Sequence, residues 1–297
     1  MSGGPDPELA PLTPTTTRQL LDAHGLAPRR TDGQSFLVDP NLVERIVTSA
    51  ALPAGAHVLE VGPGLGALTR GLLRAGHGVT AIEIDAGFVR VLAETLGGHE
   101  RLHVVHADAM EADLDGLLAD VRPPAADGAQ SERRAVPVVA NLPYNVATPL
   151  LFHLLAARTV GDMLLMVQAE VGDRWTAMPG ERSYGAVSLK LALLADAEAV
   201  FRVPPSVFLP VPRVDSVMVR VVRRSEAPDD EARARVLRLV DECFRQPRKT
   251  LRNNLLVTRP TDAVDAALEA AGLDPAVRPG RLGTSEVLAL DAALGVR

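Results

Sequence analysis

The sequence predicts an α/β fold in which a doubly wound, Rossmann-like domain is followed by a small all-helical C-terminal domain. Short apolar strands alternate with amphipathic helices between about residues 38 and 168, a pattern typical of a parallel sheet with helices on both faces. A glycine-rich turn, Gly62-Pro63-Gly64-Leu65-Gly66, follows the first strand, and such a turn lets the main chain approach a ligand closely. Beyond about residue 230 the periodicity is helical.

The same patterns divide the chain into three segments. Residues 1–17 are rich in Pro and Thr and are predicted to form a disordered tail. The α/β domain is assigned to residues 18–224. The polar stretch at 225–231 is typical of a linker, so the helical domain is assigned to residues 225–297.

The elements of the α/β domain are expected in the following order. A helix at 38–52 has Asp39 as its cap and Pro40 in its first turn, both favoured at helix starts. Strands are expected at 57–61, 78–84, 102–106, 136–140 and 163–168, with helices at 67–75, 86–96 and 148–157. Residues 121–135 lack periodicity and are expected to form a loop.

The remaining elements follow a proline-rich stretch. Strands at 197–203 and 214–223 flank four prolines between Pro204 and Pro212. Prolines are excluded from sheet interiors, so this stretch is expected to be a rigid, extended loop. Helices are expected at about 230–257, 261–271 and 284–294.

Composition excludes several classes of protein. Apolar runs are far shorter than the roughly 20 residues of a membrane span, and the N-terminus lacks the pattern of a secretory signal, so a cytoplasmic location and no membrane partner are expected. A single cysteine, Cys243, excludes an internal disulfide and a cysteine-based zinc site. His99, His103 and His106 would not converge, and no metal is expected.

Charge is distributed unevenly along the chain. The net charge of −6 argues against a nucleic-acid partner. However, residues 202–254 hold twelve Arg and Lys against seven Asp and Glu, a local excess of five positive charges. Within the helix expected at 230–257, Arg245, Arg248, Lys249 and Arg252 fall at helical spacing and are expected to form one basic face.

Acidic residues stand at three successive strand ends. Glu60 precedes the glycine-rich turn, Glu83 lies at the end of the second strand, and Asp108 follows the third. The carboxyl ends of the strands in an open α/β sheet line the ligand crevice. There Glu83 can accept both hydroxyls of a ribose, and Asp108 can accept a hydrogen bond from an adenine amino group. Nicotinamide enzymes and S-adenosylmethionine enzymes share this layout.

The fourth strand ends in Asn141-Leu142-Pro143-Tyr144. The exocyclic amine of adenine is a poor nucleophile because its lone pair is delocalised into the ring. The Asn141 side-chain oxygen and a nearby main-chain carbonyl can hold the two amine hydrogens and so favour a pyramidal nitrogen. Pro143 stiffens the turn, and Tyr144 can stack on the base and favour the cation formed on transfer. Catalysis of this kind depends on positioning and electrostatics.

These features resemble the rRNA adenine N6-dimethyltransferases, and within them the small-subunit (16S) type. The resemblance runs from about Pro28 to the C-terminus. Besides the strand-end motifs already described, it includes Gln168-Ala169-Glu170-Val171, Tyr184-Gly185, Val203-Pro204-Pro205-Ser206-Val207-Phe208, Val214-Asp215-Ser216 and Arg248-Lys249-Thr250-Leu251-Arg252-Asn253.

The resemblance implies an S-adenosylmethionine-dependent methyltransferase domain with an RNA-binding helical domain. The donor-binding residues it implies are Ser35, Leu37, Glu60, Gly62, Gly64, Glu83, Asp108, Ala109 and Asn141. The catalytic residues it implies are Asn141, Leu142 and Tyr144, and the RNA-binding residues are Tyr144, Phe208, Arg248, Lys249 and Arg252. Tyr144 and Phe208 would sandwich the target base.

The implied substrate is a pair of adjacent adenines in the 3′-terminal hairpin of 16S rRNA, in the small ribosomal subunit. The protein would act as a monomer in ribosome biogenesis, with S-adenosylmethionine and no metal. The sequence departs from the family's Gly-Gln-Asn-Phe-Leu motif, since Ser35 replaces Asn or His, and Asp32 stands where an apolar residue is usual.

Other functions stay open at this point. One is a paralogue that methylates a different rRNA adenine, of the large-subunit, macrolide-resistance type. Another is a non-catalytic rRNA-binding assembly factor, which would not need an intact Asn-Leu-Pro-Tyr. A DNA adenine methylase is disfavoured by Leu142 and the Arg-rich tail, and a nicotinamide dehydrogenase leaves the Asn141–Tyr144 motif unexplained.

Overall fold

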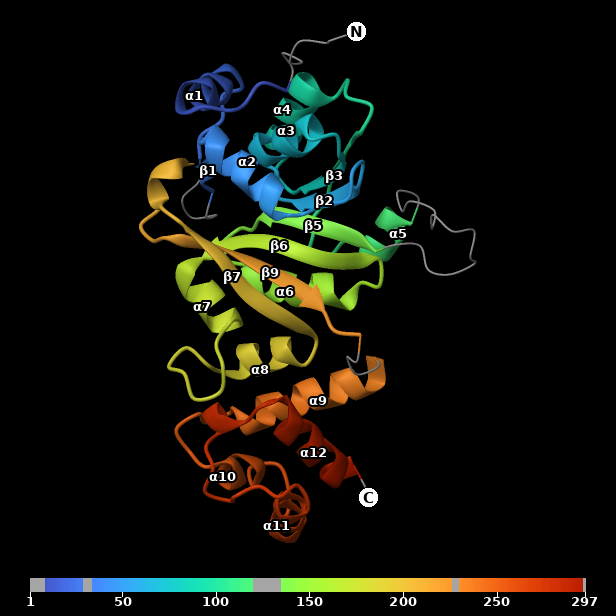
Figure 1. Cartoon of the computed structure of the whole chain (residues 1–297), viewed down its shortest axis with the longest axis vertical. Coiled ribbons are helices and arrows are strands. Elements are labelled where there is room, and N and C mark those ends of the chain that lie inside the picture. The colour runs from blue at the N-terminus through green and yellow to red at the C-terminus, as the bar shows by residue number, and fades with distance from the viewer. Residues whose placement is uncertain (1–8, 29–33, 120–134, 226–229, 296–297) are drawn as a thin grey trace. The chain divides into compact units, whose positions relative to one another are not determined.

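The computed structural model describes residues 9–28, 34–119, 135–225 and 230–295, whose elements are labelled in Figure 1. The described chain forms two compact units. The first unit holds the chain up to Ala169 together with Ala199–Val221, and the second holds Glu170–Glu198 with the chain from Val222 onward. The second unit therefore includes a segment that the sequence assigned to the α/β domain. The expected loop at 121–135 lies outside the described residues except for Ala135.

Seven strands of the described chain form one sheet, in the order β4-β3-β2-β5-β6-β9-β7. The strands are β2 (His57–Val61), β3 (Gly78–Glu83), β4 (Leu102–His106), β5 (Val136–Asn141), β6 (Val160–Gln168), β7 (Ala195–Val203) and β9 (Ser216–Arg223). The first five pair in parallel, and β9 runs antiparallel to β6. The predicted doubly wound, Rossmann-like sheet is therefore confirmed, with antiparallel pairing added at β9.

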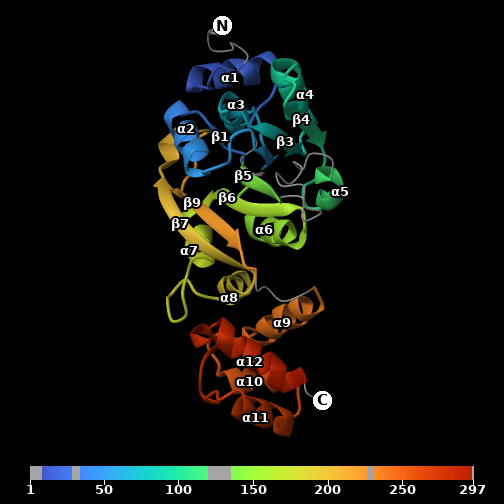
Figure 2. The same cartoon turned by 45° about the vertical axis from the view of Figure 1, so that its right-hand side comes forward.

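Helices cover both faces of this sheet. The helices are α2 (Pro40–Ser49), α3 (Ala67–Arg74), α4 (Ala86–Leu96), α5 (Leu114–Leu118) and α6 (Ala147–Ala156). Buried residues of α2, α3 and α4 form one core cluster with residues of β3, β5 and β6, such as Val79, Val139 and Leu164. Figures 1 and 2 show α6 on the opposite side of β5 and β6 from α2 and α3. The central strands are buried on both faces, which explains their continuous apolar sequences.

The described N-terminal segment begins at Leu9 and includes a helix. Helix α1 (Pro14–Ala23) begins at Thr13, whose hydroxyl accepts a hydrogen bond from the Thr16 N–H. Leu9 and Leu12 are buried in the core cluster of the first unit. The prediction of a disordered tail is therefore wrong for residues 9–17, while residues 1–8 lie outside the described chain. A threonine followed by a proline is also typical of the start of a helix. Burial of Leu9 and Leu12 stabilises this segment.

A two-stranded ribbon joins two segments that are distant in sequence. Strand β1 (Phe36–Leu37) pairs antiparallel with β8 (Phe208–Leu209), so that Leu37 lies opposite Phe208. The Val38 N–H donates to the Val207 carbonyl at 2.9 Å. The proline-rich stretch is thus a short 3-10 helix (Pro205–Val207) followed by β8, in place of the extended loop that the sequence predicts.

The second unit consists mainly of helices. They are α7 (Ala169–Trp175), α8 (Ala186–Ala192), α9 (Asp230–Cys243), α10 (Leu251–Leu255), α11 (Thr261–Ala270) and α12 (Thr284–Gly295). The first residue of α7, Ala169, belongs to the first unit, and the rest of α7 belongs to the second. Tyr184 donates its hydroxyl to the Leu282 carbonyl, and Lys190 pairs with Asp241 at 2.6 Å. These contacts explain why residues 170–198 group with the C-terminal helices.

The prediction of a single helix at about 230–257 is wrong. Helix α9 ends at Cys243 and α10 begins at Leu251. Pro247 lies between them, and a proline removes a helical hydrogen bond and clashes with the preceding turn. Within the described chain, no helix combines the length and the apolar character needed to cross a membrane.

Candidate active site

A pocket of about 490 Å³ lies in the first unit, where β2, β3, β4 and β5 end. The carboxyl ends of parallel strands meet at one edge of the sheet, so side chains that follow each strand are brought together. The lining includes every sequence-predicted donor-binding and catalytic residue: Ser35, Leu37, Glu60, Gly62, Gly64, Glu83, Asp108, Ala109, Asn141, Leu142 and Tyr144.

The glycine-rich turn between β2 and α3 forms one wall of the pocket. Gly62 and Gly64 have φ angles of 69° and 56°, in the left-handed region that side chains disfavour. A Cβ atom at Gly64 would lie 3.1 Å from the ring of Phe36, and one at Gly62 would lie 3.7 Å from the ring of Pro143. The turn therefore presents bare main chain to the pocket.

Glu83 is held in one orientation at the end of β3. Its Oε2 accepts a hydrogen bond from the Gly64 N–H at 3.0 Å, and its Oε1 accepts one from the Asp85 N–H at 2.9 Å. The side chain is 5% exposed, and burial raises the pKa of the carboxyl despite these donors. The carboxyl of Glu83 is thus tied directly to the glycine turn.

Glu60 lies behind the turn and is more deeply buried. Its exposed fraction is 2%, and its Oε2 accepts a hydrogen bond from the Thr69 hydroxyl at 2.7 Å. The pKa of Glu60 is raised to about 8, chiefly by burial; the Thr69 hydrogen bond opposes this rise, and the negative charge of Glu83 adds to it. The carboxyl of Glu60 is therefore largely protonated and uncharged at neutral pH.

Asp108 follows β4 and lies at the far side of the pocket. Its Oδ1 accepts a hydrogen bond from the Met110 N–H at 2.8 Å. Its other oxygen accepts no hydrogen bond from any described residue. The half-buried carboxylate therefore has a free acceptor on the lining, next to the buried Ala109.

Asn141 carries the most distinctive polar atom of the pocket. Its Nδ2 donates to the main-chain carbonyl of Ser35 at 3.4 Å. Its Oδ1 is buried and receives no hydrogen bond from the described residues. A buried acceptor without a donor costs free energy and is uncommon in folded proteins. The contact uses the main chain of Ser35, so it does not depend on the departure from the family motif at this position.

The residues that follow Asn141 complete the turn. The Leu142 N–H donates to the Met166 carbonyl at 3.0 Å, and its side chain is 1% exposed. Tyr144 is half-buried, and its hydroxyl lies 2.8 Å from the Ser216 hydroxyl. Burial raises the pKa of Tyr144, so its phenol stays neutral near neutral pH.

Comparison with known proteins agrees with this geometry. The sequence pattern of the family described as "Ribosomal RNA adenine dimethylase" matches residues 25–288. The chain belongs to this family. It is 37% identical over 292 residues to Ribosomal RNA small subunit methyltransferase A of Geobacillus thermodenitrificans, covering 95% of this chain and 96% of that protein. It is 43% identical over 293 residues to the protein of the same name from Leifsonia xyli, covering 96% and 99%.

Solved structures show the same fold. The crystal structure of the 23S rRNA methyltransferase ErmE matches with a TM-score of 0.64 and 30% identity, covering 88% of this chain and 99% of that one. A dimethyladenosine transferase from Plasmodium falciparum matches with a TM-score of 0.68 and 24% identity, covering 86% and 95%. The fold of the chain is therefore shared with these two solved structures.

Phe208 does not lie where the sequence prediction requires. Its ring is 1% exposed and belongs to the core cluster of the first unit. It lies opposite Leu37 in the β1–β8 ribbon and is not part of the pocket lining. The expected stacking of a base on Phe208 is wrong for this structure, because a buried ring offers no face to a base.

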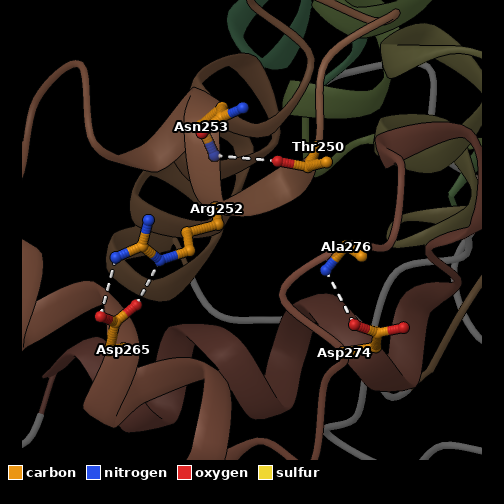
Figure 3. Close-up of polar contacts among 6 residues, drawn as sticks. All are labelled: Thr250, Arg252, Asn253, Asp265, Asp274 and Ala276. Carbon is orange, nitrogen blue, oxygen red and sulfur yellow. Dashed lines mark hydrogen bonds and ion pairs between the residues drawn. The ribbon is translucent and has the colours of Figure 1, made fainter.

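The basic residues of the second unit do not form a helical ridge. Arg245, Arg248 and Lys249 lie in the segment 244–250 between α9 and α10, and all three are exposed. Arg252 lies in α10 and is paired with Asp265, with Nε–Oδ1 and Nη2–Oδ2 distances of 2.6 and 2.9 Å (Figure 3). We call residues 245–249 the basic loop; Arg252 lies outside it, and its charge is matched.

A buried asparagine holds the basic loop. Asn254 is 1% exposed. Its Oδ1 accepts a hydrogen bond from the Gln246 N–H at 2.7 Å, and its Nδ2 donates to the carbonyls of Gln246 and Thr250 at 3.1 and 3.0 Å. The loop is therefore clamped at both ends by one side chain.

Ile84 and Phe88 are among the pocket residues that the sequence did not indicate. Ile84 lines the pocket and is 63% exposed, and the buried Phe88 of α4 also belongs to the lining. A large apolar residue directly after a strand-end carboxylate could have indicated Ile84, because such a residue faces the crevice. Among the described residues, no group of three or more His, Cys, Asp or Glu side chains is arranged to hold a metal ion.

Proposed function

We propose that this chain is an S-adenosylmethionine-dependent rRNA adenine N6-dimethyltransferase. Its proposed substrate is the pair of adjacent adenines in the 3′-terminal hairpin of 16S rRNA, on which it acts as a cytoplasmic monomer during assembly of the small ribosomal subunit. The relatives named small-subunit methyltransferases, which cover almost the whole chain, support this substrate. The observation that carries the proposal is the buried, partnerless Oδ1 of Asn141 beside Tyr144.

The pocket suits the methyl donor. S-adenosylmethionine supplies an electrophilic methyl group bonded to a sulfonium sulfur. Glu83 and Asp108 offer carboxylate oxygens for hydroxyl and amino donors, and Gly62 and Gly64 line the pocket with main chain that carries no side chain. Glu60, Leu37, Ala109 and the main chain of Ser35 complete the proposed donor site.

The Asn141–Tyr144 turn performs the catalytic work. The Asn141 Oδ1 accepts one hydrogen of the adenine amine, and a main-chain carbonyl of the turn accepts the other. Leu142 acts through its main chain, which the bond to Met166 fixes. Tyr144 stacks on the base, and the π face of its ring favours the positive charge that develops on the amine. The methylated ammonium is acidic enough to release its proton to water, so these residues include no general base.

The basic loop provides a surface for RNA phosphates. Arg248 and Lys249 are exposed and have no charged partner among the described residues. Phosphate contacts position a nucleic acid without reading its sequence, and single-stranded loop bases are what RNA-binding proteins usually recognise. The loop therefore supplies affinity, and the pocket supplies the choice of base.

The decisive experiment is methylation of small ribosomal subunits that lack adenine methylation. We expect transfer of methyl groups to two adjacent adenines near the 3′ end of 16S rRNA, mapped by primer extension and mass spectrometry. Modification of large-subunit rRNA alone would assign the chain to the macrolide-resistance type. Subunit binding without transfer would assign it to the assembly factors.

Calorimetry tests the donor separately. We expect binding of S-adenosylmethionine and of its demethylated product, and no binding of NAD. Binding of NAD without S-adenosylmethionine would support the dehydrogenase alternative.

A further inference from the structure

The tyrosine of the catalytic turn has a polar partner that its proposed role does not require. The Tyr144 hydroxyl lies 2.8 Å from the hydroxyl of Ser216. Ser216 is the first residue of β9 and is completely buried. The contact joins two segments of the first unit that are 72 residues apart in sequence.

The sheet fixes the position of the serine. Ser216 lies opposite Gln168 in the β6–β9 pairing, and the Ala169 N–H donates to the Asp215 carbonyl at 2.9 Å. These bonds anchor both sides of Ser216. Its Oγ therefore forms a fixed point at the carboxyl end of β6.

The turn that carries Tyr144 is anchored to the same strand. The Leu142 N–H donates to the Met166 carbonyl at 3.0 Å, and Asn141 lies opposite Met166 in the β5–β6 pairing. Strand β6 thus holds the turn on one side and Ser216 on the other. The hydroxyl contact closes a frame around the end of this strand.

The presence of a serine at this position needs an explanation. Val217, Met218 and Val219 follow it, and all three are almost completely buried. A buried hydroxyl without a hydrogen bond costs free energy, so an apolar residue would suit a purely structural role in this strand. The Tyr144 hydroxyl is the partner that satisfies the Ser216 side chain.

We propose that Ser216 is a positioning residue that holds the ring of Tyr144 in the orientation needed to stack on the target adenine. This inference rests on the proposed function. The side chain of tyrosine has two rotatable bonds, and a bond at the tip of the ring restricts the swing about the first. The base then meets a ring that is already in place, and its amine reaches Asn141 without reorganisation of the site.

A double-mutant cycle tests this proposal in the full-length protein. The variants are Ser216→Ala, Tyr144→Phe and their combination, with small subunits lacking adenine methylation as the substrate. Phenylalanine keeps the ring and removes the hydroxyl. We expect each single change to lower kcat about three- to tenfold, as loss of one hydrogen bond does, while S-adenosylmethionine binding by calorimetry stays unchanged.

The kcat of the combined variant shows whether the two hydroxyls act together. If the two hydroxyls act through each other, the combination should be no slower than the slower single variant. Ser216→Thr, which keeps a hydroxyl, should restore most of the lost rate. The proposal would be overturned if the fold-losses of kcat in the two single variants multiplied in the combined variant. It would also be overturned by wild-type kcat in Ser216→Ala.

Two controls separate this result from other failures. Thermal unfolding shows whether Ser216→Ala folds. If it does not fold, Tyr144→Phe tests the same hydrogen bond by removing the other hydroxyl. Wild-type kcat in Tyr144→Phe would overturn the proposal by itself. Absence of methyl transfer by the wild-type protein would contradict the proposed function. In that case, the two proteins can be compared by their effect on the fluorescence of a hairpin RNA that carries 2-aminopurine as the target base. Equal fluorescence with Ser216→Ala and with wild type would overturn the positioning role independently.

Discussion

The pocket of the first unit and the basic loop of the second unit use polar groups in opposite ways. In the pocket, the carboxyls of Glu60 and Glu83 are buried and bonded, and the unsatisfied atom, Asn141 Oδ1, is held in place. In the basic loop, Arg248 and Lys249 are exposed, and Asn254 holds the loop through the main chain of Gln246 and Thr250. Orientation therefore determines what the first region can do, and net charge determines what the second can do.

The largest effect is expected when the orienting atom of the pocket is removed. Asn141→Ala should lower kcat for adenine methylation about 10²–10³-fold, which is typical for loss of one oriented contact in a transition state. S-adenosylmethionine affinity should change much less, because the glycine turn and Glu83 remain. Single-turnover methylation and calorimetry measure the two quantities.

The matched control for this change is Asn141→Asp. The aspartate keeps an acceptor oxygen at the same place. However, it repels the Ser35 carbonyl, which accepts a hydrogen bond from the Asn141 amide in the wild-type protein. Its rate should lie between those of the wild type and Asn141→Ala. An alanine variant as active as the aspartate variant would show that the acceptor oxygen is not used.

Burial in the pocket should also appear as a pH dependence of stability. The pKa of Glu60 is raised from about 4.5 to about 8 by burial. Between these values the folded protein holds a proton that the unfolded chain releases, so wild-type stability falls as the pH rises. Glu60→Gln cannot ionise, and its stability relative to wild type should rise by up to about 1.4 kcal/mol per pH unit in this window.

Urea denaturation at pH 5, 6.5 and 8 measures this difference. Glu44→Gln, which removes an exposed carboxylate from α2, controls for the loss of one negative charge. A constant difference between Glu60→Gln and wild type across the three pH values would contradict the raised pKa.

Charge, in contrast, should dominate the basic loop. Arg248→Ala combined with Lys249→Ala should weaken binding to small-subunit rRNA about tenfold and reduce the slope of log affinity against log salt by about one to two. Donor binding should not change. Filter binding at several salt concentrations gives both quantities.

Arg252→Ala is the internal comparison for the basic loop. Because Arg252 is paired with Asp265 (Figure 3), its removal should weaken RNA binding by less than about twofold and leave the salt slope nearly unaltered. An effect of Arg252→Ala equal to that of the loop variant would mean that the ion pair opens to bind phosphate.

A smaller effect than that of the loop variant is expected from removal of the clamp. Asn254→Ala removes no charge, but the loop must then be ordered on binding, which should weaken RNA affinity about threefold. Asn253→Ala changes the neighbouring exposed amide and should bind as the wild type does. Equal affinities of folded Asn254→Ala and wild type would show that the loop needs no clamp.

The sequence predicted the pocket well for a topological reason. Parallel pairing places the carboxyl ends of β2, β3, β4 and β5 at one edge, so Glu60, Glu83, Asp108 and Asn141 could be grouped without knowing any distance. The pairing of β9 and the grouping of residues 170–198 with the C-terminal helices depend on tertiary contacts such as the one from Lys190 to Asp241. Such contacts leave no local signal in the sequence.

The errors have equally physical causes. Helical spacing was extended through Pro247, although a proline interrupts a helix, and the basic ridge was lost with that helix. Threonine-rich composition suggested disorder at residues 9–17, where burial of Leu9 and Leu12 holds the chain. Phe208 was assigned to the base because it is aromatic, but its place opposite Leu37 in the ribbon puts its ring in the core.

The β1–β8 ribbon also constrains the order in which the site can be completed during translation. Strand β1 leaves the ribosome early, whereas its partner, Phe208–Leu209, and the Ser216 that meets Tyr144 leave after β2 to β6. A nascent chain that ends near residue 200 can hold the glycine turn and the strand-end carboxylates. It lacks the partner that holds Phe36 and Leu37 beside the pocket. The Phe36–Leu37 wall of the pocket therefore acquires its strand partner only when synthesis has passed β8.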